Sequence, residues 1–200
     1  MPTDAEAEQT MGMPIAKDRV WTVEDVWALP NDPHHRYEVV DGELLVSPSP
    51  RLSHQVAVVA LVGLLDDYAR AHRIGIAVSA PSDVVLDPKT IVQPDVYVLP
   101  LVNGRRVADD DPKPVPLLAV EVLSPSTARF DRLVKRLRYQ RAGIEYWVVD
   151  LDARLVEHWT PDAARPQICG TALEWWPLGA AARLTIDLVA MFQEIGGDPV

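Results

Sequence analysis

Residues 116–124, PLLAVEVLS, decide how this sequence folds. A nearly continuous apolar run of this length is typical of a β-strand that is buried on both faces of a sheet. Glu121 interrupts the run. A buried carboxylate without a partner costs several kcal/mol or takes up a proton, so Glu121 needs a cation, hydrogen-bond donors or a metal ion. An arginine paired with this acid is the purely structural alternative.

The segments on either side alternate between strand and helix patterns. Asp41-Gly42 lies between two alternating runs and predicts a hairpin over 36–46. Capping residues and apolar spacing predict helices over 22–30 (N-cap Thr22), from about 54 to 70 (capped by Ser53), and from 126 or 127 to about 143. Further strands are expected at 74–80, 82–87, 93–99, 145–151 and 154–160, and the tail alternates weakly at 173–176 before a short helix over 188–192. These elements predict an α/β fold, with a mixed central sheet flanked by helices and an N-terminal hairpin.

Length and composition are those of one globular domain. The chain has 200 residues, 48% of them apolar and 24% charged. We expect a disordered tail over 1–18 and a single domain over 19–200. The single cysteine, Cys169, excludes an internal disulfide and a cysteine-based zinc site. The sequence contains neither a secretory signal pattern nor an apolar run long enough to cross a membrane, so a cytoplasmic location without membrane contact is expected.

The net charge of −10 argues against a protein that coats nucleic acid non-specifically. It does not exclude a nuclease, because only the local field at a DNA groove matters. Residues 129–141 are locally basic, with six Lys or Arg against one Asp. Arg132, Arg136 and Arg138 are therefore candidates for contacts with the DNA backbone. The alternative is an ordinary solvated helix face.

Two further acids lie in sequence that resembles a strand. Asp95 follows Pro94 at the start of an apolar run, and Glu38 lies in the first strand of the hairpin. Each alone is ordinary, because Asp after Pro often caps a turn and half-exposed strands commonly carry Glu. Together with Glu121 they can converge on Mg²⁺, which prefers oxygen ligands and needs only one or two protein carboxylates. Such an open site suits phosphoryl transfer.

The order of several motifs resembles a known family. These motifs are YEVVDGEL (37–44), SHQ (53–55), QPDVYV (93–98), AVEVLSPST (119–127), the spaced Asp131, Lys135 and Tyr139, and AGIEYWVVD (142–150). They are similar to the restriction-endonuclease-like family of the Uma-two type, within the PD-(D/E)xK nuclease superfamily, over about residues 20 to 160. The resemblance implies a restriction-endonuclease-like core and hydrolysis of phosphodiester bonds in DNA. It also implies a requirement for Mg²⁺, for which Mn²⁺ is expected to substitute.

Carried over to this chain, the resemblance makes Asp95 and Glu121 the metal-binding carboxylates and Glu38 the acid of the N-terminal element. One position departs from the pattern. The superfamily has a lysine two residues after the second acid, where this chain has Leu123. The resemblance suggests that Lys135, on the following helix, takes over the role of orienting the attacking water or stabilising the transition state. The same family pattern has a histidine at His54, which would contact phosphate or support Glu38, unless it is simply exposed at a helix start.

Helical spacing bears on Lys135. Asp131, Lys135 and Tyr139 form an i, i+4, i+8 row. We expect the core stripe on another face, at Phe130, Leu133, Val134 and Leu137. Lys135 then either faces a cleft over the strand ends or points to solvent in a helix pair with Asp131.

The prediction is a metal-dependent endonuclease acting on DNA. Cutting both strands with one active site per chain would favour a homodimer. The first rival is a family member that has lost catalysis and binds nucleic acid or protein, which Leu123 and the acidic balance favour. The second is a glycosidase-like hydrolase with two carboxylates, which needs a deep apolar or aromatic cleft and no metal.

Overall fold

The computed structural model describes residues 19–30, 32 and 35–197, so the predicted tail over 1–18 lies outside the described residues. Its helical elements are α2 (Val23–Trp27), α3 (Leu52–Ala71), α4 (Ala128–Phe130), the π-helix η1 (Asp131–Lys135), α5 (Arg136–Arg141) and α6 (Leu188–Gly196). The strands are β1 (His35–Val40), β2 (Glu43–Pro48), β3 (Gly75–Ser79), β4 (Val84–Asp87), β5 (Thr90–Val92), β6 (Val96–Pro100), β7 (Leu118–Val122), β8 (Glu145–Asp150), β9 (Leu155–Trp159), β10 (Gln167–Cys169), β11 (Ala172–Trp175) and β12 (Leu184–Asp187).

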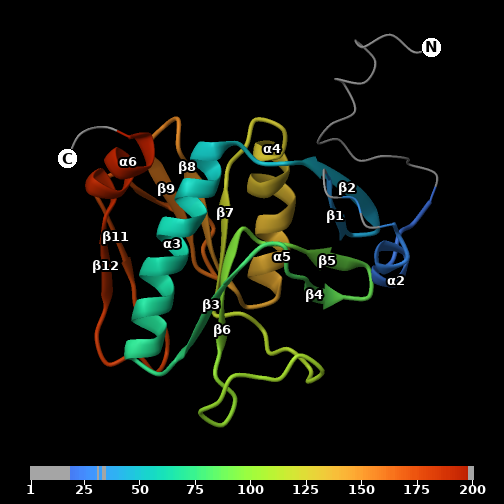
Figure 1. Ribbon diagram of the computed structural model, residues 1–200, viewed down its shortest axis with the longest axis horizontal. Helices are drawn as coiled ribbons and strands as arrows, with labels where there is room; N and C mark the ends of the chain where they lie inside the picture. Colours follow the sequence, from blue (N-terminus) through green and yellow to red (C-terminus); the bar gives the residue numbers. More distant parts are fainter. Residues whose placement is uncertain (1–18, 31, 33–34, 198–200) are drawn as a thin grey trace.

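A six-stranded mixed sheet forms the centre, in the order β10-β9-β8-β7-β6-β3. β7 and β8 run parallel, and the other neighbours are antiparallel. All five residues of β7 are buried, as the apolar run over 116–124 predicts. Helices α3 and α6 cover one face of the sheet, and the α4–η1–α5 segment covers the other (Figure 1). The predicted α/β class with a mixed sheet flanked by helices is therefore confirmed.

The predicted hairpin is present and belongs to a second, smaller sheet. β1 and β2 pair in register from His35↔Pro48 to Val40↔Glu43. Asp41 and Gly42 both have positive φ, as a two-residue hairpin turn of this kind requires. The short strands β5 and β4 complete the order β2-β1-β5-β4. The segment between β5 and β6 leads from this small sheet into the central sheet, and Asp95 lies on it.

Of the predicted helix caps Thr22 and Ser53, the structure contains the first and not the second. Thr22 caps α2 in a complete capping box with Asp25, as predicted. α3 begins earlier than predicted, at Leu52, with Arg51 at the N-cap and no side-chain cap hydrogen bond. Ser53 is thus inside the first turn and is not the cap. Packing of the buried face of α3, which includes Ala57, Leu61 and Leu65, stabilises the helix without a capping side chain.

The predicted core stripe of the helix over 126–143, which the structure divides into α4, η1 and α5, is wrong. Leu133 and Leu137 are 50% and 42% exposed, whereas the row of Asp131, Lys135 and Tyr139 is buried. The polar pair on this row can be buried because other strands supply charged partners for it, described below. Helical periodicity alone identifies two faces and cannot show which one finds such partners.

The C-terminal part extends the fold. β11 and β12 form a separate antiparallel pair, and α6 packs beside α3. The alternation at 173–176 marks β11, whereas the sequence analysis predicts neither β10 nor β12. No helix within the described ranges is long and apolar enough to span a membrane.

Candidate active site

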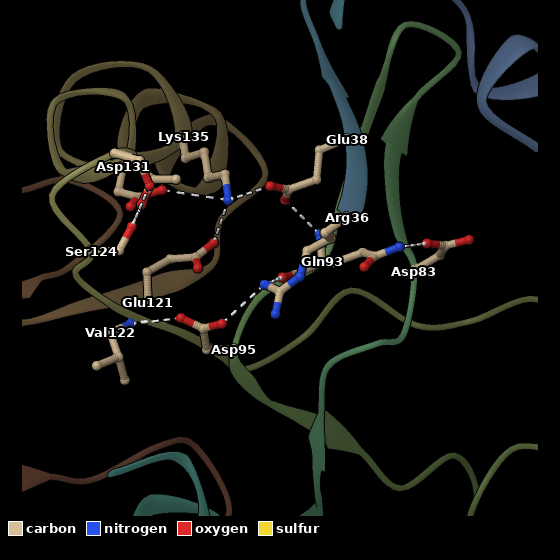
Figure 2. A network of polar contacts seen from close by, with 12 residues as sticks. Arg36, Glu38, Asp83, Gln93, Asp95, Glu121, Val122, Ser124, Asp131 and Lys135 are labelled. Atoms are coloured by element: carbon tan, nitrogen blue, oxygen red, sulfur yellow. Dashed lines mark hydrogen bonds and ion pairs between the residues drawn. The ribbon is translucent and has the colours of Figure 1, made fainter. Parts of the chain in front are cut away.

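Four of the predicted site residues meet in one pocket of about 580 Å³. Glu38 comes from β1, Asp95 from the segment before β6, Glu121 from β7 and Lys135 from η1 (Figure 2). All four are buried, although each carries an ionisable group. The two sheets and the η1 segment therefore each contribute charge to the same point.

Lys135 is the centre of the cluster. Its Nζ lies 2.9 Å from Glu38 Oε2, 2.9 Å from Glu121 Oε1 and 3.4 Å from Asp131 Oδ1. Burial acts to lower the pKa of Lys135, but these three acids raise that pKa well above its usual range. The solvent-facing alternative is therefore wrong, because the side chain is 3% exposed. Lys135 is a fixed ammonium ion that donates hydrogen bonds and cannot act as a base near neutral pH.

Glu121 lies between this cation and the pocket. Its Oε1 accepts hydrogen bonds from Lys135 Nζ and, at 3.1 Å, from Tyr139 Oη. Burial raises the pKa of Glu121 well above its usual range; Lys135 opposes this, and Asp131, Asp95 and Glu38 add to it. Burial and the neighbouring acids thus outweigh Lys135, so the surroundings disfavour the negative charge of this carboxylate.

Asp95 has a different environment. Its Oδ2 accepts from the backbone N–H of Val122 at 2.9 Å and lies 3.0 Å from His54 Nε2, and its Oδ1 accepts from Arg36 Nη1 at 3.0 Å. Burial acts to raise the pKa of Asp95, but His54, Arg36 and Val122 lower it to about 2. Asp95 is therefore an ionised carboxylate whose orientation is fixed by three partners from three segments.

Glu38 connects the cluster to the small sheet. Its Oε1 accepts from the backbone N–H of Gln93 at 2.7 Å, while Oε2 contacts Lys135. Arg36 Nη1 also donates to the carbonyl of Gln93 at 3.1 Å. The sequence reasoning missed Arg36 and Gln93. Arg36 lies two residues before Glu38 on β1, on the same side of the strand, so the period of two could have identified it. Gln93 acts through its backbone N–H and carbonyl, for which the sequence carries no signal.

The carboxylates of the pocket are the candidate ligands for a metal ion. Within the part of the chain that the structure describes, no three or more His, Cys, Asp or Glu side chains are grouped closely enough to hold a metal ion. Both oxygens of Glu38 and both oxygens of Asp95 already accept hydrogen bonds or ion pairs, so either acid would have to exchange a partner for a metal ion. Asp95 and Glu121 both line the pocket. Two carboxylates with water for the other positions suit Mg²⁺, so the residues present fit the ion.

The residues predicted to contact DNA lie partly inside and partly outside the pocket. His54 is buried and contacts Asp95, not Glu38, so an exposed helix-start histidine is excluded. Arg132 lines the pocket but pairs with Asp150 at 2.8 Å and with Glu157. Arg136 and Arg138 lie outside the pocket. The first stacks on Trp159, and the second pairs with Asp41.

The pocket rim carries hydroxyl groups. Ser124 Oγ lies 3.0 Å from Ser126 Oγ and 3.0 Å from Thr127 Oγ1. Thr127 occupies the N-cap of α4 without a side-chain cap hydrogen bond, so helix capping does not use these groups. None of the described lining residues is Phe, Tyr or Trp, so the pocket gives the glycosidase alternative no aromatic cleft.

Comparison with known families agrees with this geometry. The Uma2 family model, described as "Putative restriction endonuclease", matches residues 23–188. This chain belongs to the Uma2 family. The resemblance inferred from the sequence motifs is thereby confirmed. Uma2 membership supports nuclease activity in general terms.

The fold of this Uma2 chain also occurs in a solved structure. A protein from Anabaena variabilis ATCC 29413, described as "a putative nuclease belonging to DUF820", matches with a TM-score of 0.73 and 19% sequence identity. The match covers 88% of this chain and 99% of that chain. At this identity the likeness shows the shared fold. A search of curated proteins finds no match.

Proposed function

We propose that this chain is a Mg²⁺-dependent endonuclease that hydrolyses phosphodiester bonds in DNA, with Mn²⁺ able to substitute. One observation carries the proposal. Asp95, on the segment before β6, and Glu121, on β7, lie buried in one pocket beside the protonated Lys135. The arrangement combines oxygen ligands for a hard cation with a fixed positive charge, both of which phosphoryl transfer uses.

The carboxylates and Lys135 would have different roles, which follow from their protonation states. Asp95 and Glu121 would hold Mg²⁺, which when bound neutralises charge on the phosphate and lowers the pKa of a bound water. Asp95 is ionised and held by Val122, His54 and Arg36, so its orientation costs nothing at the moment of binding. Lys135, which stays charged, donates to the developing negative charge on the phosphate. It thereby takes the role of the lysine that Leu123 replaces.

Cleavage assays with matched acid variants test this proposal. Purified wild type should nick supercoiled plasmid DNA with Mg²⁺ or Mn²⁺ and be inactive with EDTA, and Asp95→Ala should abolish nicking. Glu174→Ala is the control, because Glu174 is an exposed acid on β11, outside the pocket. Calorimetric titration with Mn²⁺ gives a readout independent of catalysis, and Asp95→Ala should lose that binding too. Undiminished nicking by Asp95→Ala would refute the assignment.

The rival function is a binding module that has lost catalysis. Its support is that Lys135, Arg36 and His54 already contact the carboxylates, and that Leu123 replaces the expected lysine. The same experiments separate the two functions. A wild type that binds no Mn²⁺ and cuts nothing, yet retains DNA, would establish the rival.

A homodimer belongs to the proposal as the means of cutting both strands of a duplex. Leu52, Val56 and Val59 expose apolar side chains on the outer side of α3 and are the candidate contact. Sedimentation velocity should then show a dimer that Val59→Glu converts to monomer. A wild type that sediments as a monomer at all accessible concentrations would contradict the dimer.

A further inference from the structure

A second pocket of about 490 Å³ adjoins the active-site pocket. The two share Arg36 and the residues of segment 48–50. The second pocket is lined in part by apolar and aromatic side chains, namely those of Trp27, Leu29, Pro30, Tyr37, Pro50 and Pro81. None of the described residues that line the active-site pocket is Phe, Tyr or Trp, so the two pockets differ in the chemistry that they can bind.

Trp27 gives the second pocket a fixed aromatic surface. Its side chain is 59% exposed, yet its Nε1–H donates to Asp83 Oδ2 at 3.0 Å. Val23 and Val26 anchor α2 through their buried side chains. An indole that is exposed and also held in place can stack on a planar ligand with little further loss of side-chain entropy.

Hydrogen bonds connect this surface to the catalytic acids. Asp83 Oδ1 accepts from Gln93 Nε2 at 2.9 Å, and the backbone N–H of Gln93 donates to Glu38. The Gln93 carbonyl accepts from Arg36, which also donates to Asp95 (Figure 2). Gln93 thus links Asp83 to both Glu38 and Arg36. The pocket is therefore built as one unit with the active site.

The charges of the second pocket disfavour phosphate and allow an uncharged ligand. Asp32 and Asp83 contribute carboxylates, with His35 paired to Asp32, whereas Arg36 lies at the boundary with the active site. A phosphate placed deep in this pocket would face both acids. A nucleobase carries no charge, has two faces for stacking and offers N–H groups to acceptors.

We propose that the second pocket binds an unpaired base of the nucleic acid, adjacent to the phosphodiester bond in the active-site pocket. The inference rests on the proposed nuclease function and narrows its substrate to strands with an unpaired nucleotide near the cut. A paired base cannot enter, because its edge and both faces are occupied within the duplex. Trp27 stacks on the base, and the carboxylates of Asp32 and Asp83 accept from its N–H groups.

Binding of fluorescein-labelled decathymidylate, measured by anisotropy with Ca²⁺ in place of Mg²⁺, tests the inference. Base stacking on one aromatic side chain is worth about tenfold in affinity. Trp27→Ala should therefore weaken binding about tenfold, and Trp27→Phe, which keeps an aromatic face, should retain most of the affinity. Trp176→Ala is the matched control, because Trp176 is 62% exposed and lies outside both pockets. Annealing the probe to decadeoxyadenylate should weaken binding to wild type.

Three results would overturn the inference: wild type that does not bind the single strand, Trp27→Ala that binds as well as wild type, or Trp27→Phe that loses as much as Trp27→Ala. The last result would mean that the bond to Asp83, and not stacking, matters. Failure of the nuclease proposal looks different. Binding that depends on Trp27 in a chain that cuts nothing contradicts the proposed catalysis, whereas nicking that needs Asp95 but ignores Trp27 contradicts only the base pocket.

Discussion

Lys135 is surrounded by more negative charge than one cation can neutralise. Glu38, Glu121 and Asp131 all lie within ion-pair distance of its Nζ. Burial raises the pKa of Asp131 as it does that of Glu121, with Lys135 opposing in both cases. Such a surplus of buried acid destabilises the folded chain, and it suits a site that binds an additional cation.

The first prediction at this scale concerns Glu121→Gln. The amide keeps the shape of the carboxylate and removes one buried charge, while Lys135 retains Glu38 and Asp131. We expect the metal-free variant to be more stable than wild type near neutral pH, because one surplus buried charge is removed. Thermal unfolding measures this, and nicking by the variant should be lost. A lower melting temperature than wild type would contradict the argument.

Lys135→Met should have the opposite effect. The change leaves three buried acids without their shared cation, and breaking a buried ion pair in this way costs about 3–5 kcal/mol. Urea unfolding should therefore show a large loss of stability at neutral pH that becomes smaller as acid protonates the cluster. Lys89→Met, at an exposed position in the β4–β5 turn, is the control and should unfold like wild type. Equal midpoints for both variants would contradict the central place of Lys135.

At the scale of elements, the α4–η1–α5 segment turns a polar row toward the sheet. Tyr139 is buried with its hydroxyl on Glu121, whereas Leu137 is 42% exposed. We predict that Leu137→Ala costs less than about 1 kcal/mol, as exposed substitutions do. Tyr139→Ala should cost about 3–5 kcal/mol, because it opens a cavity and removes a buried hydrogen bond. Chemical denaturation of the two variants compares them, and a larger loss at Leu137 would restore the face that periodicity predicts.

How far the sequence predicts each element depends on where its partners lie. The buried strand around Glu121 and the hairpin at Asp41-Gly42 depend on local pattern and turn chemistry, so both are predicted correctly. Which face of the α4–η1–α5 segment is buried depends on the ion pair between Lys135 and Glu38. Glu38 is far away in the sequence, so local periodicity cannot reveal this contact. The same holds for Arg36, whose contact with Asp95 joins two sheets. The acids of the site, Lys135 and His54 could be selected from the sequence and its family resemblance, but not the pairing of Arg36 with Asp95 or of Lys135 with Glu38.

For the whole molecule, the site exists only where two sheets meet. Arg36 and Glu38 come from the small sheet, and Glu121 from the central sheet. Asp95 lies on the segment that passes from one sheet to the other. Ionic contacts at this junction therefore tie the packing of the two sheets to the protonation of the site. The stability of the metal-free protein should report that protonation.

The dependence of stability on pH should have two limbs. Glu121 and Asp131 have pKa values raised by burial, so the folded chain binds more protons than the unfolded chain between those raised values and about 4.5. The free energy of unfolding should then rise as the pH falls through that window. Asp95 has the opposite shift: with burial overcome by His54, Arg36 and Val122, its pKa is lowered to about 2. Its contribution, about 2 kcal/mol, is complete above a pH of about 4 and is lost as the pH falls toward 2.

Urea unfolding from pH 7 to 2 in EDTA should therefore show a maximum of stability on the acid side of neutrality. Glu121→Gln should reduce the rising limb and leave the steep loss below pH 4. Saturating Mg²⁺ should raise stability at neutral pH in wild type and have no such effect in that variant, because a ligand stabilises only the state that binds it. A stability that falls steadily from pH 7 to 4 would show that the buried acids are fully neutralised by Lys135, and the case for an additional cation at this junction would fail.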